Sequence, residues 1–165
     1  MTENKIKIFI VDDHDLIREG LDRILSFEDN ISILRECKNG REVLELLEKE
    51  VPDIILLDIN MPVLNGIDTL KEIKKRFNKI KVIMLTVEDD RRTITEVIDI
   101  GADGYILKES AGSEIVNAIK AVSNNEKYMD VALLKIIFHD IKDNFRKEKS
   151  IIYTDKTSVI QQIIK

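Results

Sequence analysis

Short apolar runs recur along this chain, and four of them stop at a polar residue. These runs span residues 8–11, 54–57, 82–85 and 105–107. Apolar runs of this length, separated by helical patterns, predict strands of a parallel sheet that is covered on both faces. Parallel strands end at the same edge of their sheet, and ligands bind outside that edge. The polar residues that follow the runs are therefore the first candidates for a functional site.

A fifth strand and a series of amphipathic helices complete the pattern. Residues 31–37 predict a strand whose alternation is less clean. Between the strands, apolar residues recur at spacings of three and four, as on one face of a helix. Gly101 follows the fourth helix and predicts its C-terminal cap. The alternation predicts a doubly wound α/β domain with a five-stranded parallel sheet, and these patterns alone leave the strand order open.

The character of the chain changes after this domain. We assign residues 1–125 to the α/β domain and residues 126–150 to a helical linker that ends in a charged, solvated stretch. Residues 151–165 contain a capping signal at Thr154 or Asp155 and then a short apolar stripe. A helix this short needs a surface to pack on. We therefore expect that a segment on which this helix would pack is missing from the sequence given.

Net charge, cysteine content and targeting patterns limit the partners and the cellular compartment that we expect for this chain. The net charge of −5 argues against nucleic acid or an anionic membrane as a partner of the whole chain. The single cysteine, Cys37, excludes an intramolecular disulfide bond. The sequence has neither a signal-peptide pattern nor an apolar run of membrane-spanning length. We expect a soluble protein in the cytoplasm.

Five polar side chains are expected to meet at the carboxyl edge of the sheet. They are Asp12, Asp13, Asp58, Thr86 and Lys108, each directly after or at the end of an apolar run. Carboxylates placed close together repel unless a cation relieves them, and Mg²⁺ takes oxygen ligands. A lysine supplies a positive point charge, and a threonine supplies a hydroxyl donor for a phosphoryl oxygen. The set predicts Mg²⁺-dependent phosphoryl transfer, which requires mostly positioning and charge neutralisation.

Each of these residues also has an ordinary structural interpretation. Asp12 and Asp13 could simply cap the helix that follows them. Lys108 could be a surface lysine, and Thr86 an ordinary strand residue. The functional interpretation is preferred because every member of the set falls at the carboxyl end of a strand.

In combination the motifs resemble the receiver domain of two-component response regulators. The resemblance rests on residues 11–14, 57–66, 85–86 and 101–108 and covers the α/β domain. It implies a flavodoxin-like sheet with strand order 2-1-3-4-5 and a helical extension at the C-terminal end. Lys108 followed by Glu109 and Ser110, together with the later Tyr-Met-Asp segment, is similar to the LuxR/NarL branch of the family.

The resemblance assigns roles to the acidic residues. Asp58 matches the phosphoacceptor of the family. Asp13 and Asp58 match direct Mg²⁺ ligands, and the backbone carbonyl of Asn60 matches a third. Asp12 matches the acidic residue that supports the ion through water.

The resemblance also assigns a switch. Thr86 and Lys108 match the pair that contacts the phosphoryl group, and Tyr105 matches the aromatic side chain that becomes buried when the threonine moves. Asn60, Val87 and Glu88 match positions that tune the phosphorylation and dephosphorylation rates. We expect the β-branched Val87 to narrow access to the acyl phosphate.

The implied partners follow from the same resemblance. A sensor histidine kinase would supply the phosphoryl group, and the phosphorylated protein would control output as a homodimer. Residues 153–164 weakly resemble the opening of a helix-turn-helix domain, so the resemblance implies that residues 151–165 are the start of a truncated or degenerate output domain. A recognition helix is missing from the sequence given, so DNA binding would need an output domain that is incomplete in this chain.

Three other interpretations compete with a phosphorylated switch. A receiver that is never phosphorylated could serve as a protein-docking module, but such modules usually lose an acidic residue or the lysine. A phosphohydrolase with an aspartyl-phosphate intermediate would carry a second aspartate where this chain has Asn60. A flavodoxin-like nucleotide binder would need a phosphate-binding loop where this chain has Asp12 and Asp13.

Overall fold

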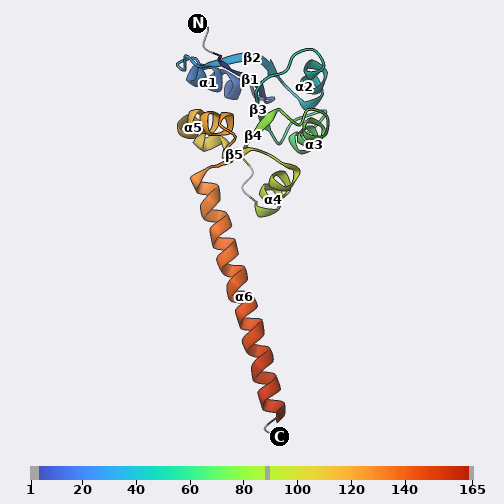
Figure 1. Cartoon of the computed structure of the whole chain (residues 1–165), viewed down its shortest axis with the longest axis vertical. Coiled ribbons are helices and arrows are strands. Elements are labelled where there is room, and N and C mark those ends of the chain that lie inside the picture. The colour runs from blue at the N-terminus through green and yellow to red at the C-terminus, as the bar shows by residue number, and fades with distance from the viewer. Residues whose placement is uncertain (1–3, 88–89, 164–165) are drawn as a thin grey trace. The chain divides into compact units, whose positions relative to one another are not determined.

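The structure is a computed structural model that describes residues 4–87 and 90–163, with side chains described as far as residue 150. The chain divides into two units, Met1–Asp130 and Val131–Lys165. The first unit contains every strand of the described chain, and the second consists of a single long helix (Figure 1). Each unit is described separately below.

Parallel strands form one sheet in the first unit (Figure 1). The order β2-β1-β3-β4-β5-β6 confirms the doubly wound fold and the order expected for the first five strands. All neighbouring pairs in this sheet are parallel. The strands are β1 (Ile6–Val11), β2 (Ile31–Cys37), β3 (Ile54–Asp58), β4 (Lys81–Thr86), β5 (Gly104–Leu107) and β6 (Tyr128–Met129).

The expected count of five strands is wrong, because β6 adds a sixth. Tyr128 pairs with Gly104, and Met129 pairs with Tyr105. A strand of two residues has no alternation or apolar run by which a sequence pattern could reveal it. The carboxylate of Asp130 fixes its end by accepting a hydrogen bond from the backbone N–H of Leu107 at 3.2 Å.

Helices cover both faces of the sheet. In Figure 1, α1 and α5 lie on one side of the sheet, and α2, α3 and α4 lie on the other. Side-chain oxygens of Asn39, Asn65 and Asp90 cap the N-termini of α2, α3 and α4. Gly101 ends α4 with a φ of 115°, which confirms the predicted cap. The helices are α1 (Asp15–Leu25), α2 (Gly40–Leu47), α3 (Gly66–Arg76), α4 (Arg91–Ile100) and α5 (Ala111–Ser123), with a 3-10 turn, η1 (Lys108–Ser110), before α5.

The main core lies between the sheet and helices α1 and α5. Alternate residues of β1, β3 and β4 point into it, which is the side-chain period of a strand. The central strands β1 and β3 have no exposed apolar residue, and the buried aspartates Asp12 and Asp58 lie at their carboxyl ends. The core side chains with no exposed surface include Ile8, Ile10, Ile54, Leu56, Ile83, Ile106, Ile115 and Ile119.

The second unit is the helix α6 (Val131–Ile163). It runs without interruption through Thr154, so the separate helix start expected there is wrong. No glycine or proline occurs between residues 131 and 163 to break the helix. Among the described residues, no helix is both long and apolar enough to span a membrane.

Candidate functional site

The carboxyl ends of three strands bring two buried carboxylates and one ammonium group together. Asp12 follows β1, Asp58 ends β3, and Lys108 follows β5. The Lys108 Nζ atom lies 2.7 Å from Asp12 Oδ2 and 3.0 Å from Asp58 Oδ2. Each carboxylate side chain is 2% exposed, and the lysine side chain is 9% exposed. The structure therefore brings Asp12, Asp58 and Lys108 together at the carboxyl edge of the sheet, as the sequence pattern predicted.

Burial leaves the Asp58 carboxylate poorly stabilised as an anion. Burial is the main cause that raises the pKa of Asp58, and the neighbouring negative charge of Asp12 raises this pKa further. The Lys108 ammonium and the backbone N–H of Asn60 oppose this rise. The pocket therefore carries more negative charge than its single lysine neutralises, which favours a bound cation.

Unsatisfied oxygen atoms provide an independent test of whether a metal fits. Asp12 Oδ2, Asp13 Oδ1 and Asp58 Oδ2 are buried, and no well-oriented hydrogen bond reaches them in the described structure. Their close partners are the Lys108 ammonium group, which two of them share, and the His14 ring. Buried polar groups normally have well-oriented hydrogen bonds, so three carboxylate oxygens that share one ammonium group and one imidazole ring leave acceptor capacity for a further ligand. Oxygens of carboxylates are the ligands that Mg²⁺ prefers. Asp12, Asp13 and Asp58 therefore fit a hard divalent cation.

His14 joins the pocket, which the sequence analysis did not predict. Its Nδ1 atom lies 2.8 Å from Asp12 Oδ1, 3.2 Å from Asp13 Oδ1 and 3.4 Å from Lys108 Nζ. The four side chains of Asp12, Asp13, His14 and Asp58 offer ligand atoms that all lie within 4.8 Å of one another. The sequence feature that could have indicated this role is the position of His14 directly after Asp12 and Asp13.

Arg18 holds the strand end that carries the first aspartate. Its guanidinium group donates to the backbone carbonyl of Asp12 at 2.6 Å and also pairs with Asp15. The Arg18 side chain is only 11% exposed. A buried guanidinium with these partners restrains the loop between β1 and α1, and thereby the position of Asp12 and Asp13.

The loop after β3 is fixed by close backbone packing. The backbone N–H of Gly66 donates to the carbonyl of Ile59 at 2.7 Å, and Val63 adopts a positive φ of 68°. The backbone N–H of Asn60 approaches Asp58 Oδ1 at 3.4 Å. This packing sets the direction of the chain directly after the buried carboxylate.

The remaining predicted residues lie on β4 and β5. Thr86 ends β4 and is fully buried, and it pairs in register with Leu107, the residue before Lys108. Tyr105 on β5 is also buried, with 1% of its surface exposed. Val87 is 69% exposed. Glu88 lies outside the described residues.

The fold and the site define a class of protein: a doubly wound domain with an acidic, lysine-bridged pocket at the carboxyl edge of its sheet. Residues 8–120 match the response regulator receiver domain. The chain therefore belongs to the receiver family of response regulators.

The relatives that this chain matches include proteins named as transcriptional regulators and as response regulators. The chain is 40% identical over 129 residues to the transcriptional regulatory protein DegU of Brevibacillus brevis, which covers 78% of this chain and 55% of DegU. It is 35% identical over 129 residues to the response regulator protein VraR of Staphylococcus saprophyticus, which covers 78% of this chain and 62% of VraR. The chain thus spans between half and two thirds of the length of these relatives.

Solved structures agree with this assignment. A LuxR-family two-component response regulator from Aurantimonas sp. SI85-9A1 superposes with a TM-score of 0.78 at 25% identity, covering 82% of this chain and 97% of that chain. The signal receiver domain of a NarL response regulator from Mycobacterium tuberculosis superposes with a TM-score of 0.68 at 30% identity, covering 73% of this chain and 98% of that chain.

Proposed function

We propose that this chain is the receiver part of a two-component response regulator and is phosphorylated on Asp58 by a sensor histidine kinase. The observation that carries the proposal is the buried Asp58 carboxylate, held 3.0 Å from the Lys108 ammonium group and beside buried oxygens of Asp12 and Asp13 that have no well-oriented hydrogen bond. The working protein is a cytoplasmic homodimer that controls transcription through an output domain. Residues 1–125 form the receiver, residues 126–150 the linker, and residues 151–165 the start of that domain.

The proposed reaction makes an acyl phosphate and needs no other covalent catalyst. A carboxylate oxygen of Asp58 attacks the phosphorus atom, and the bond from phosphorus to the leaving group of the donor breaks. Lys108 neutralises charge that develops on the phosphoryl oxygens. When bound, Mg²⁺ supplies further neutralisation of that charge. Asp12, Asp13 and Asp58, with the backbone carbonyl of Asn60, would hold the ion.

In this proposal the phosphoryl group also draws the hydroxyl group of Thr86 towards the pocket. Thr86 moves relative to the buried Tyr105, and the conformational equilibrium shifts because the phosphorylated pocket interacts differently with the two states. The register pairing of Thr86 with Leu107 supports this assignment, because it places the hydroxyl group one residue from Lys108 along the sheet edge.

The proposal is tested by the intact mass of the protein after incubation with acetyl phosphate or phosphoramidate, with and without Mg²⁺. We expect a gain of one phosphoryl group that requires Mg²⁺ and is absent from Asp58→Asn. This variant should fold and unfold at a higher temperature than the wild type in metal-free buffer, because a buried negative charge has been removed. A wild-type mass that stays unchanged with both donors would contradict the proposal and favour a docking module.

Val87→Ala tests the proposed tuning of the site. We expect small phosphoryl donors to react several-fold faster with this variant, because the β-branched side chain directly follows the buried Thr86 and narrows access to Asp58. The rates of phosphorylation and of dephosphorylation are measured separately by mass over time. Equal rates for Val87→Ala and the wild type in both directions would remove this role. Glu88 and Asn60 are proposed to tune the same rates.

A further inference from the structure

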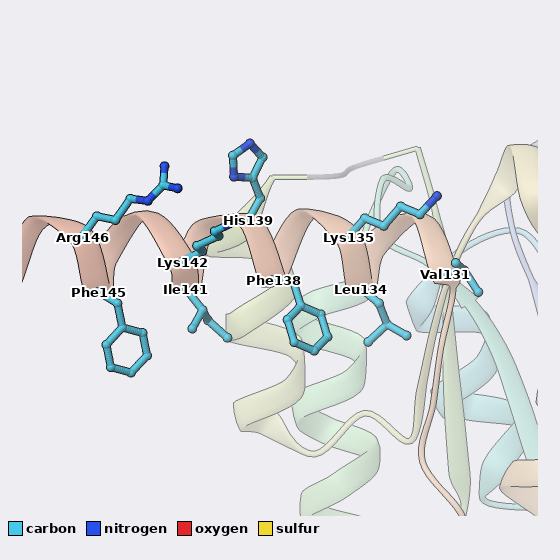
Figure 2. A pocket seen from close by; sticks show the side chains of 9 residues that line it. All are labelled: Val131, Leu134, Lys135, Phe138, His139, Ile141, Lys142, Phe145 and Arg146. Carbon is cyan, nitrogen blue, oxygen red and sulfur yellow. The ribbon is translucent and has the colours of Figure 1, made fainter.

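Five apolar side chains form a stripe along the first half of the described α6. They are exposed by 54%, 39%, 70%, 44% and 62% of their surface, in chain order, which is high for residues of this size. Figure 2 shows Leu134, Phe138, Ile141 and Phe145 projecting from the same side of the helix. The stripe consists of Val131, Leu134, Phe138, Ile141 and Phe145.

The spacing of the stripe indicates what covers it. The successive intervals are three, four, three and four residues, which is the a and d pattern of a heptad repeat. Val131, Phe138 and Phe145 take the a positions, and the other two residues take the d positions. A seam this narrow fits one partner helix, whereas the surface of a globular domain requires a wider apolar face.

The charges beside the stripe select the orientation of the partner. Lys135, Lys142 and Lys149 occupy successive e positions, and Ile137 and Asn144 occupy g positions. In an antiparallel pair of identical helices, e positions face e positions, so lysine would face lysine. In a parallel pair, e positions face g positions, where the lysine stems can cover an isoleucine and an uncharged asparagine.

We propose that the α6 helices of two copies of this chain associate in parallel through the stripe. Identical registers make such an interface self-complementary about a two-fold axis. The heptad continues to Ile152 and Val159 at a positions, with Glu148 and Asp155 at d positions. The tightest part of the seam is therefore residues 131–145. The inference rests on the homodimer proposed above and names its surface.

The test measures association of the unphosphorylated full chain by sedimentation equilibrium, so it is independent of whether Asp58 accepts a phosphoryl group. We expect a concentration-dependent dimer for the wild type. Phe138→Asp should weaken association by about 100-fold or more, because each dimer loses two buried aromatic rings and gains two buried charges. Lys147→Asp, a matched change at an outward c position of the same helix, should leave the dimer intact.

Orientation is tested with a single cysteine. Phe145→Cys in a Cys37→Ala background should form a disulfide between the two copies on mild oxidation, because equivalent a positions face each other only in a parallel pair. The inference is overturned by a wild type that stays monomeric, by a dimer that Phe138→Asp leaves unchanged, or by an absence of the disulfide. It is also overturned if the full wild-type chain stays monomeric and binds anionic vesicles through this stripe, so that Phe138→Asp abolishes the vesicle binding.

Discussion

Gly66→Ala is expected to lower the free energy of unfolding of the receiver by about 2–3 kcal/mol or more. A Cβ atom built on Gly66 would lie 1.9 Å from the backbone carbonyl oxygen of Asp58 and 2.7 Å from the Cα atom of Ile59. Both neighbours are backbone atoms, so no side-chain rotation can relieve the overlap. The end of β3 or the start of α3 must move, which also displaces the phosphoacceptor. Urea unfolding followed by circular dichroism measures the loss.

Gly20→Ala provides the matched control for this substitution. Gly20 lies within α1, and no atom lies within 4 Å of a Cβ built there. We expect this change to stabilise the protein by about 0.5–1 kcal/mol through higher helix propensity. If Gly66→Ala matched the wild type in stability and in phosphorylation rate, the close approach of α3 to β3 would not be the constraint described here.

Asp103→Ala is expected to cost about 3 kcal/mol of unfolding free energy at neutral pH. The Asp103 carboxylate is buried, and it accepts a hydrogen bond from the backbone N–H of Val82 at 2.9 Å. It also pairs with Lys74 at 2.6 Å and with Lys127 at 2.8 Å. Removing it leaves a largely buried ammonium group and a buried N–H without their acceptor. The substitution Asp99→Asn, at an exposed position of α4, should change stability little.

The pH dependence of stability separates the charge of Asp103 from its packing. Burial raises the pKa of Asp103, but Lys127 and Lys74 outweigh burial and hold that pKa below the ordinary value of 3.8. A depressed folded pKa means that the stabilisation is present above the unfolded pKa and is lost as the pH falls through the folded value. We therefore expect Asp103→Asn to flatten the acid limb of the stability curve. An acid limb identical to that of the wild type would contradict this contribution.

The amino-acid pattern was sufficient to predict most of the α/β domain and its charged edge. Buried strands leave continuous apolar runs, so β1, β3, β4 and β5 were visible, and the carboxyl-edge rule then grouped Asp12, Asp58 and Lys108. In contrast, β6 is held by backbone pairing and by the Asp130 carboxylate, and neither has a periodic signature.

Side-chain geometry was the part that could not be predicted. The positions of His14 and Arg18 against Asp12 depend on how the loop after β1 turns, and local spacing does not determine that turn. The continuous course of α6 through Thr154 illustrates a different limit, since a capping residue can also be accommodated inside a helix when no glycine or proline breaks it.

The strand β5, which contains Tyr105, is hydrogen-bonded to the last residues of the receiver unit as well as to β4. The backbone N–H of Asp130 donates to the carbonyl of Tyr105 at 3.0 Å, and its carboxylate accepts from the N–H of Leu107. The last residue of the receiver unit is therefore clamped at two points to the strand that leads into Lys108. We therefore expect a displacement of that strand to move Asp130 with it.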